Sequence, residues 1–340
     1  MLKKILSLIV PFVLIMTIYA QELSPFVFVS DDETPAIAHV ARTRDNRDYA
    51  FAEQYTDPGA VIFHDGQFHM FRNGFVGWPA TVWVHYMVSD DGVEWEQSSQ
   101  DPVLLTEDVP FADIASLASS VIVEADGTWV LYFYTWNNSS GAFSDGEIGR
   151  ATADNLQGPW IVDDEPILTM GDAGDFDEQG VSSPHVIQTD EGYIMYYDGI
   201  ASDNGRSVGI ATSADGINWE KVGDNPILAP VADWEGAFLH QARVIALDAG
   251  YMMVYRGATA QSGGMRLGVA TSEDGYTWQR ADDFILSPDM LEHHTAIWFT
   301  STAYREDELY LFIELMPSSN VTDIFTMKAA IADLVTLVEE

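Results

Sequence analysis

The pattern Ser-x-Asp-Gly-x-x-Trp occurs three times in this chain, as Ser89-Asp-Asp-Gly-Val-Glu-Trp95, Ser213-Ala-Asp-Gly-Ile-Asn-Trp219 and Ser272-Glu-Asp-Gly-Tyr-Thr-Trp278. An Asp side chain can hydrogen-bond the backbone of its own turn, and Gly accepts the positive φ that such a turn requires. We therefore interpret each Asp-Gly pair as a turn between two strands. We predict that the Trp of each copy packs between neighbouring repeats and does not contact a ligand.

Similar strands precede these turns. Gly209-Ile-Ala-Thr-Ser213 and Gly268-Val-Ala-Thr-Ser272 are nearly identical, and an altered copy lies at Gly149-Arg-Ala-Thr-Ala153. The spacing is about sixty residues, and self-similarity at a fixed period marks a repeat architecture. A weaker fifth unit covers residues 300–333, with Met327 to Ala332 in the place of the repeated strand.

Each unit has the same internal order of a β-rich run, a tight polar turn, an aromatic strand, a third strand that ends at the Asp-Gly turn, and a short fourth strand. Short strands with Gly turns and aromatic or β-branched enrichment indicate hairpins. Four antiparallel strands per unit, repeated five times, predict an all-β fold, a five-bladed β-propeller over residues 55–340. Residues 21–54 are expected to pack on the propeller or to close it, and almost no helix is expected.

The first twenty residues have the composition of a secretory signal. Lys3 and Lys4 precede an apolar run from Ile5 to Ile18, and polar residues begin at Gln21. The run is shorter than the roughly 20 residues of a membrane-spanning helix. We therefore predict a signal peptide over residues 1–20, cleaved after Ala20, and a secreted or periplasmic protein. The chain has no cysteine, so its stability must come from a large core.

Acidic residues outnumber basic residues by 53 to 15. Such a charge repels nucleic acid and anionic lipid, so we expect neither as a partner, and no membrane association after signal removal. The excess of acidic residues is explained by solubility or by adaptation to a salty medium. The alternative is that acidic residues bind cations or a cationic substrate. The aromatic content is typical of packed sheets or of sugar-binding surfaces.

In a propeller the first strand of each blade lines the central channel, and the end of the second strand lies at the same mouth. Trp faces there suit a sugar ring, amides suit its hydroxyl groups, and arginines could clamp a carboxylate or a hydroxyl pair. The candidate substrate-binding residues are Arg72, Asn73, Trp78, Trp136, Asn137, His240, Arg243, Arg256, Trp298 and Glu314. The expected partner is a carbohydrate.

Residues 55–335 resemble the five-bladed glycosidase propellers, namely glycoside hydrolase family 43 (arabinanases and xylosidases), family 32 (invertases and levanases) and the mannoside phosphorylases. The repeated turn carries part of this resemblance. The other motifs are Thr56-Asp57-Pro58-Gly59, Leu156-Gln-Gly-Pro-Trp160 and Asp224-Asn-Pro-Ile-Leu228.

The resemblance implies catalysis by carboxylates that flank the scissile glycosidic bond. Asp57 matches the first-blade base or nucleophile. The other two family acids are replaced, by Ser182-Ser183-Pro184 in the third blade and by His240-Gln241-Ala242-Arg243 in the fourth. The catalytic candidates are therefore Asp57, Glu178 and Asp198, with Glu235 and Glu314 next. His240 could be a general acid, a ligand contact or the partner of a channel cation such as calcium, although no cofactor is required.

The leading hypothesis is a secreted glycosidase that acts on plant or algal oligosaccharides or polysaccharides at the channel mouth. The alternative is a non-catalytic carbohydrate-binding propeller that kept the cleft and lost its acids. A lyase or a phosphorylase is a third reading, and phosphate-dependent turnover or an unsaturated product would reveal either one.

Overall fold

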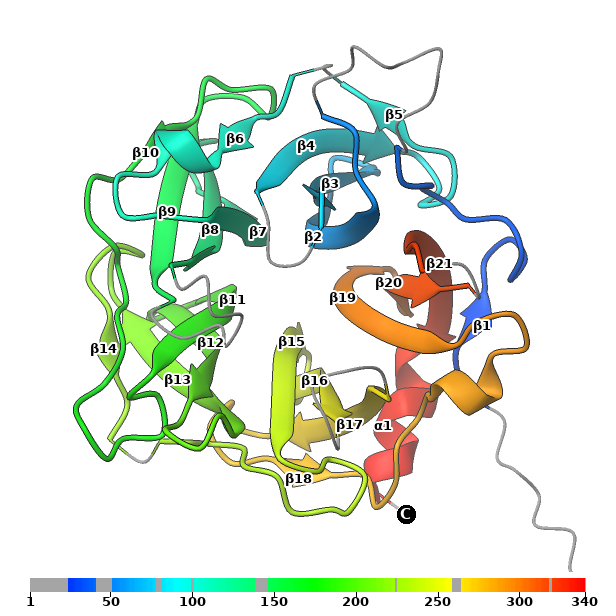
Figure 1. The fold of residues 1–340 in the computed structure, drawn as a ribbon. Helices are drawn as coiled ribbons and strands as arrows, with labels where there is room; N and C mark the ends of the chain where they lie inside the picture. Colours follow the sequence, from blue (N-terminus) through cyan, green and yellow to red (C-terminus); the bar gives the residue numbers. More distant parts are fainter. Residues whose placement is uncertain are drawn as a thin grey trace, which may run out of the picture.

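The computed structural model describes residues 24–40, 51–77, 81–98, 101–137, 146–223, 225–258, 264–317 and 320–339. These residues form antiparallel strand groups, here called meanders 1 to 5, that surround a common axis (Figure 1). The predicted signal peptide and Trp78 lie outside the described residues. No helix within the described ranges is long and apolar enough to cross a bilayer.

Meanders 1 and 2 are built from consecutive strands in antiparallel order. Meander 1 comprises β2 (Tyr55–His64), β3 (Gln67–Phe75), β4 (Val82–Ser89) and β5 (Glu96–Gln97), with β6 (Leu104–Leu105) also paired to β4. Meander 2 comprises β7 (Ala115–Val123), β8 (Trp129–Trp136), β9 (Ile148–Ala153) and β10 (Ile161–Val162). The predicted repeat of four strands is thus present in both.

Meanders 3 and 4 follow the same order, and one parallel pair, Arg206 with Phe238, joins them into a single sheet. Meander 3 comprises β11 (Gly180–Thr189), β12 (Gly192–Ile200), β13 (Arg206–Ser213) and β14 (Glu220–Lys221). Meander 4 comprises β15 (Phe238–Leu247), β16 (Gly250–Ala258), β17 (Arg266–Ser272) and β18 (Gln279–Arg280).

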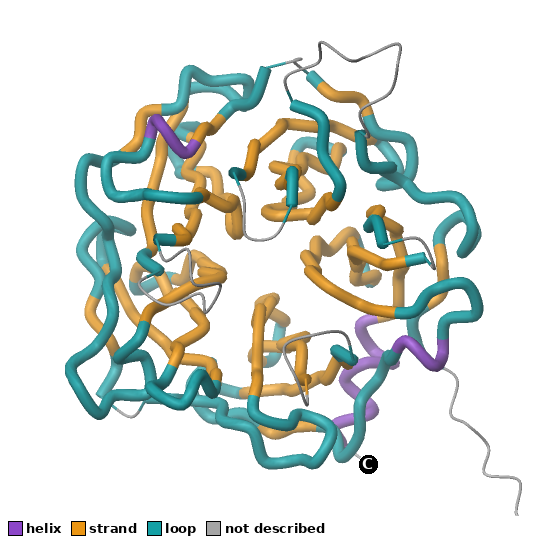
Figure 2. The backbone as a smooth tube through the Cα atoms, viewed as in Figure 1, coloured by secondary structure: helices purple, strands orange, loops and turns teal. Residues whose placement is uncertain are grey.

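Meander 5 takes its outer strand from the other end of the chain. It comprises β19 (Ala296–Arg305), β20 (Glu308–Met316) and β21 (Asp323–Ala330), with β1 (Val27–Phe28) paired to β21. Helices are few, as Figure 2 shows: the 3-10 turns η1 (Thr106–Asp108) and η2 (Pro288–Met290), and the helix α1 (Ile331–Glu339). The all-β class predicted from the sequence is confirmed.

The helix α1 was not predicted, because the sequence places Met327 to Ala332 in the repeated strand, whereas β21 ends at Ala330 and α1 begins at Ile331. Its buried side chains, Leu334 and Val338, are four residues apart and therefore lie on one helical face. That face packs into the core that meanders 4 and 5 share. The segment contains β-branched residues, which are common in strands. Tertiary packing, rather than local propensity, stabilises the helix here.

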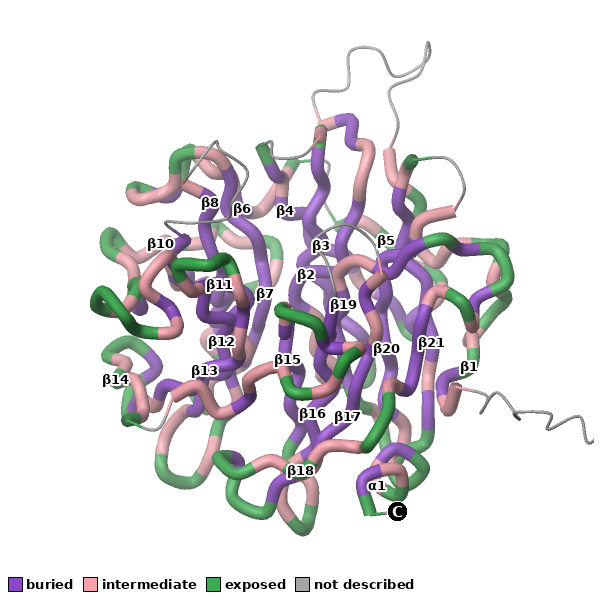
Figure 3. The backbone as a smooth tube through the Cα atoms, turned by 60° about the horizontal axis from the view of Figure 1, so that its bottom comes forward, coloured by how far each residue is buried: buried purple, intermediate pink, exposed green. Residues whose placement is uncertain are grey.

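Buried residues concentrate on the strands, whereas the loops at the outer edge are exposed (Figure 3). The second strands carry the largest buried rings, among them Phe71, Tyr132, Tyr197 and Tyr255. The side chains of neighbouring meanders interdigitate into apolar clusters between the sheets. The aromatic strands that the sequence repeats thus supply the core.

The three Ser-x-Asp-Gly-x-x-Trp turns join meanders 1, 3 and 4 to the meander that precedes each of them around the axis. In each copy the indole Nε1 donates to the Gly carbonyl of its own turn, at 3.0 to 3.2 Å. That same carbonyl accepts a hydroxyl from the preceding meander: Tyr132 to Gly216 (3.2 Å), Tyr196 to Gly275 (3.0 Å) and Thr326 to Gly92 (2.5 Å).

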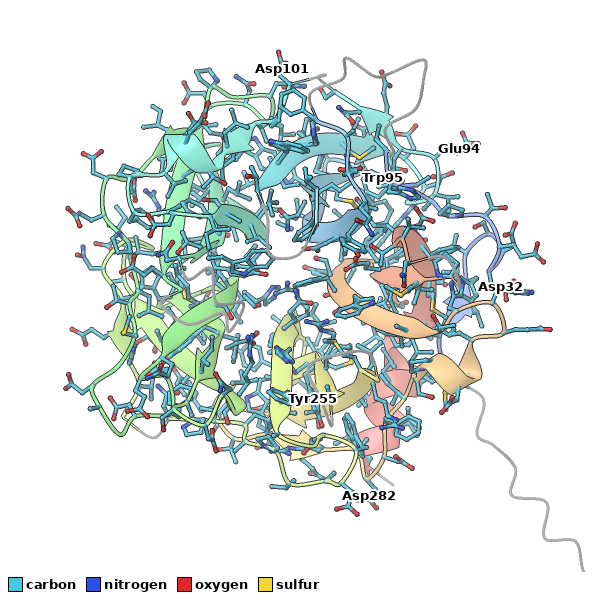
Figure 4. All side chains as sticks on the ribbon, viewed as in Figure 1. Asp32, Glu94, Trp95, Asp101, Tyr255 and Asp282 are labelled. Carbon is cyan, nitrogen blue, oxygen red and sulfur yellow. The ribbon has the colours of Figure 1, made fainter. Side chains whose placement is uncertain are left out.

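The Trp rings themselves pack edge-on against rings of the preceding meander. Trp219 contacts Tyr132, and Trp278 contacts Tyr196. Trp95 (labelled in Figure 4) contacts Phe312 of meander 5, so the same contact joins the last meander to the first. The predicted role of these Trp residues between repeats is confirmed.

Candidate active site

The first strand of every meander has a bulge near its start, and the candidate site is built on these bulges. The register shifts lie between Asp57 and Ala60, Ala118 and Ser120, Ser182 and His185, His240 and Arg243, and Ile297 and Thr300. A bulge bends the strand, turns a side chain to a new direction, and is common next to active sites.

Three of the bulges contain a residue with positive φ: Gly59 at 58°, Ser183 at 51° and Gln241 at 47°. A Cβ on Gly59 would lie 2.1 Å from the Phe71 carbonyl oxygen, so this position requires Gly. Positive φ at the non-glycine residues Ser183 and Gln241 is uncommon and occurs where surrounding structure holds it. Positive φ therefore recurs within the bulges of meanders 1, 3 and 4, at the first bulge residue in meanders 3 and 4 and at the second in meander 1.

Hydrogen bonds connect the bulges around the axis. The Asn73 amide of meander 1 bonds both the carbonyl and the N–H of Ala118 in meander 2. In meander 4 the Gln241 N–H donates to Asp198 of meander 3 at 2.9 Å, and its side-chain oxygen accepts from the Thr300 N–H of meander 5, also at 2.9 Å. The residues at the axis thus hold one another in place.

Asp57 is 1% exposed and accepts hydrogen bonds on both carboxylate oxygens, from the Gly59 N–H at 2.6 Å and from the Asn73 amide at 2.9 Å. Burial raises the pKa of Asp57 to about 6, against the opposing effect of these bonds and of the nearby Arg243 and Arg256. A carboxyl with this pKa is ionised at neutral pH and can act as a base or nucleophile.

Glu314 lies at the end of β20 and is also buried. One of its oxygens accepts the Thr322 hydroxyl, and the other accepts the Phe299 N–H at 3.1 Å. Burial and the charge of Asp57 raise the pKa of Glu314 to about 8. Two carboxyls whose environments separate their pKa values form the arrangement expected of a general acid and its partner.

Asp198 is fully buried, and its Oδ2 has no hydrogen-bond partner within the described part of the chain. Its negative charge opposes the effect of burial on three arginines, Arg206, Arg243 and Arg256. Burial lowers the pKa of all three guanidinium groups, that of Arg256 to about 10. Arginine is not deprotonated in proteins at neutral pH, so all three carry a positive charge. The axis therefore contains charges of both signs.

His240 lies opposite Arg256 in the β15–β16 register. Its Nδ1 is 3.4 Å from an Arg206 guanidinium nitrogen and 3.7 Å from Asp198 Oδ2. Burial and Arg206 lower the pKa of His240 to about 4, so the ring is neutral at neutral pH. A neutral imidazole can hydrogen-bond a ligand, but it is not the protonated imidazolium that would act as a general acid.

Two small cavities adjoin this cluster, and Trp298 and Phe299 line both of them. The first, here called the arginine cavity, has a volume of about 50 Å³, and its polar lining includes Ser182, Ser183, Arg206, His240 and Arg256. The second, here called the glutamate cavity, has a volume of about 220 Å³, and its lining includes Glu314, Tyr55, Phe75 and Thr322.

Most of the predicted site residues meet at this place. Five of them lie close enough for their charges to shift one another's pKa values, namely Asp57, Asp198, Arg243, Arg256 and Glu314. Trp136, His240, Arg256 and Trp298 line the arginine cavity.

Three predicted residues are placed elsewhere. Arg72 forms a buried ion pair with Glu53 and donates to the Thr56 hydroxyl at 2.7 Å. Asn137 accepts from the Asp113 N–H at 3.1 Å. Glu178 lies on the loop before β11, where it accepts from the Gly174 N–H at 2.6 Å, and a bond from Ser202 lowers its pKa. None of the three lines either cavity in the described chain.

Ser182, which the sequence aligns with Asp57 and His240 at the start of a first strand, lines the arginine cavity. Sequence reasoning missed Tyr134 and Arg206 as members of this cavity. Tyr134 is buried between charges, and burial together with Asp57 and Asp198 raises the pKa of its hydroxyl. Arg206 begins the third strand of its meander, whereas the candidate residues lie on the first and second strands and the loops before them.

The channel cation near His240 stays a prediction. Calcium prefers six to eight oxygen ligands, whereas the described neighbours of His240 supply one carboxylate, Asp198, and a guanidinium. Among the described residues no group of three or more acidic or histidine side chains could hold a metal ion. These residues alone are a poor fit for calcium.

Comparisons with known proteins identify the fold and the family. The family model of the glycosyl hydrolases family 32 N-terminal domain matches residues 52–225, just over half of the chain. The model of beta-1,4-mannooligosaccharide phosphorylase matches residues 183–309. A search of the curated proteins finds no match to this sequence. The predicted resemblance to these propeller families is confirmed.

Solved structures of similar fold share little sequence with the chain. A glycosyl hydrolase from Bacteroides ovatus is 17% identical with a TM-score of 0.66, covering 89% of this chain and 94% of that one. A thermostable family-43 glycoside hydrolase is 18% identical with a TM-score of 0.62, covering 82% and 89%. Beta-1,2-mannobiose phosphorylase from Listeria innocua, in complex with beta-1,2-mannobiose, is 11% identical with a TM-score of 0.63, covering 84% and 92%. These likenesses confirm the propeller fold class.

Proposed function

The chain belongs to the glycosyl hydrolases family 32 N-terminal domain family, and on that premise we propose that it hydrolyses glycosidic bonds at the cluster of Asp57, Asp198 and Glu314. The observation that carries the proposal is the pair of buried carboxyls with separated pKa values, about 6 for Asp57 and about 8 for Glu314. At neutral pH Asp57 is ionised and Glu314 holds its proton.

These protonation states match the two roles of glycoside hydrolysis. Glu314 donates its proton to the leaving oxygen as the glycosidic bond breaks. Asp57 either attacks the anomeric carbon or removes a proton from the attacking water. In the hydrolysis a water molecule is consumed, and its hydroxyl adds to the anomeric carbon. Glu314 lines the glutamate cavity, so its proton can reach a sugar bound there.

Asp198 has a different role in this proposal. Its Oδ2 lacks a partner in the described residues, and a buried acceptor of this kind suits a sugar hydroxyl. The rings of Trp136 and Trp298, which line the arginine cavity, offer apolar faces for a sugar ring. The substrate class we propose is an oligosaccharide or polysaccharide of plant or algal origin. The composition of residues 1–20 supports secretion or export to the periplasm.

The test is product release from a panel of polysaccharides and aryl glycosides by the wild-type protein and by Asp57→Asn. We expect turnover by the wild type and a loss of at least a hundredfold in the variant, with an unchanged thermal unfolding transition. Equal turnover by the two proteins would contradict the role of Asp57.

A carbohydrate-binding propeller without catalysis is the second candidate. The observation that favours it is that both Asp57 oxygens are engaged, by Gly59 and Asn73, with 1% of the residue exposed. Saturable binding of a glycan by wild type and Asp57→Asn alike, with no product from either, would support this reading against hydrolysis.

A further inference from the structure

The arginine cavity differs in charge from the rest of the protein. Acidic side chains such as Glu94 and Asp282 lie at the outer edge of the molecule (Figure 4). The cavity is lined instead by Arg206 and Arg256, and none of its lining residues in the described chain is acidic. In a chain with 53 acidic and 15 basic residues, two buried arginines on one cavity of about 50 Å³ need an explanation.

Four buried polar atoms on the lining residues have no hydrogen-bond partner within the described ranges. They are Ser182 Oγ, His240 Nε2, Arg256 Nε and Trp298 Nε1. Buried polar groups are almost always hydrogen-bonded, and a buried group without a partner destabilises the fold. Since the indole and guanidinium nitrogens can only donate, a ligand that satisfies them must bring acceptors.

His240 contributes a further polar atom to this cavity. Its ring is neutral at neutral pH, because burial and Arg206 lower its pKa. Its Nδ1 faces Arg206 at 3.4 Å and Asp198 Oδ2 at 3.7 Å. Its Nε2 is buried without a partner in the described chain, and a neutral ring nitrogen can donate or accept a hydrogen bond according to the tautomer.

The charges around the axis leave one positive charge. Arg206, Arg243 and Arg256 are protonated, and Asp57 and Asp198 oppose them with two negative charges. Glu314, with a pKa of about 8, is mostly protonated at neutral pH. This surplus of positive charge favours an anionic ligand.

We propose that the arginine cavity binds the carboxylate of an acidic sugar, so that the substrate is a uronate-containing oligosaccharide. A carboxylate is a planar monoanion with two acceptor oxygens, which suits guanidinium donors and the single positive charge. Inorganic phosphate shares the oxyanion chemistry, but it is tetrahedral rather than planar, and its monoanion and dianion coexist at neutral pH. The proposal names the substrate class of the proposed hydrolase and therefore rests on that function.

The experiment measures binding to the full chain by calorimetry at pH 7 with four sugars and one salt: glucuronate, galacturonate, glucose, galactose and sodium phosphate. We expect one uronate to bind saturably, at least tenfold more tightly than its neutral counterpart. Equal affinity for a uronate and its neutral sugar would overturn the proposal. Binding of phosphate with no binding of either uronate would also overturn it and would indicate a phosphate site.

Variants connect that binding to the cavity. Ser182→Ala removes one hydroxyl from the lining, and we expect uronate affinity to fall about tenfold. Ser116→Ala is the matched control, because Ser116 Oγ is also buried without a partner among the described residues but does not line the cavity. Unchanged uronate affinity in Ser182→Ala, or an equal loss in both variants, would count against this cavity.

Arg256→Gln, which removes a charge from the cavity lining, should abolish uronate binding. If Arg256→Gln does not fold, the comparison of Ser182→Ala with Ser116→Ala decides alone. The proposed hydrolysis and the proposed carboxylate site can be refuted independently of each other. Uronate binding without hydrolysis of any substrate would refute the proposed activity and leave the carboxylate site, whereas hydrolysis of neutral substrates without uronate binding would do the reverse.

Discussion

Asp57 lies directly opposite Asn73 across the β2–β3 ladder, and the Asn73 amide donates to the Asp57 carboxylate at 2.9 Å. The same amide nitrogen also donates to the Ala118 carbonyl at 3.0 Å. Asn73 therefore positions the proposed nucleophile or base and joins meander 1 to meander 2. Equivalent register pairs, Ser182 with Asp198 and His240 with Arg256, lie at the bulges of meanders 3 and 4.

Asn73→Ala should affect both stability and the pH profile. It leaves buried groups of Asp57 and Ala118 unpaired, so we expect a loss of about 2 kcal/mol in the free energy of unfolding. Since the Asn73 bond lowers the pKa of Asp57, its removal should raise that pKa above about 6 and move the acidic limb of kcat/KM to higher pH. Asn225→Ala, which removes bonds to Ile210 and Val222, is the control for destabilisation without a change in the pH profile.

Activity should follow a bell-shaped pH profile, with limbs near pH 6 for Asp57 and near pH 8 for Glu314. Glu314→Gln cannot donate a proton, so the basic limb should disappear and the rate on poor leaving groups should fall about 10²- to 10⁴-fold. Aryl glycosides with acidic leaving groups need less protonation and should be affected much less. An equal loss on both substrate types would exclude Glu314 as the general acid.

Stability should decrease as the pH rises, because of the same two carboxyls. The pKa of Glu314 is about 8 in the folded chain and 4.5 ordinarily, so the folded state binds the proton more tightly. Its contribution is fully present below pH 4.5 and is lost as the pH rises to about 8, on the order of a few kcal/mol. Chemical denaturation at pH 5 and pH 8 should show a smaller decrease for Glu314→Gln than for the wild type. The exposed variant Glu94→Gln should behave as the wild type does.

The repeated turns should contribute strongly to stability. Trp219→Ala removes a partly buried ring that packs on Tyr132 and a bond to Gly216, so we expect a loss of about 3 kcal/mol. Tyr132→Phe removes only the hydroxyl that Gly216 accepts, with an expected loss of about 1 kcal/mol. Tyr304 is 55% exposed, and Tyr304→Ala should change stability by less than about 0.5 kcal/mol. Urea unfolding of the three variants provides the comparison.

Removal of divalent cations tests the predicted channel cation. The donors around His240 are a poor fit for calcium, since Arg206 lies 3.4 Å from its Nδ1. We therefore expect the melting temperature and any hydrolytic activity to be unchanged after treatment with a chelator. A fall in melting temperature that added calcium reverses would establish a cation site.

The sequence by itself determined the repeat, because turn chemistry is local. An Asp-Gly turn and its Trp need only a few neighbouring residues, so Ser213 to Trp219 predicts the same hairpin wherever it lies. The position of Asp57 could also be predicted, since Thr56-Asp57-Pro58-Gly59 opens the first unit. The first and second strands alternate so regularly that the residues at their ends could be nominated as neighbours.

Only the tertiary structure decided which nominated residues meet and what charge they carry. Arg72 and Arg256 both lie near the end of a second strand, yet Arg72 pairs with Glu53 and Arg256 lines the cavity. Glu178 and Glu314 are both glutamates, but one is on an exposed loop and the other is buried beside Asp57. Burial and the sum of nearby charges depend on residues more than a hundred positions apart. Burial and nearby charge cannot be predicted from a local sequence pattern, because the packing around the axis determines both.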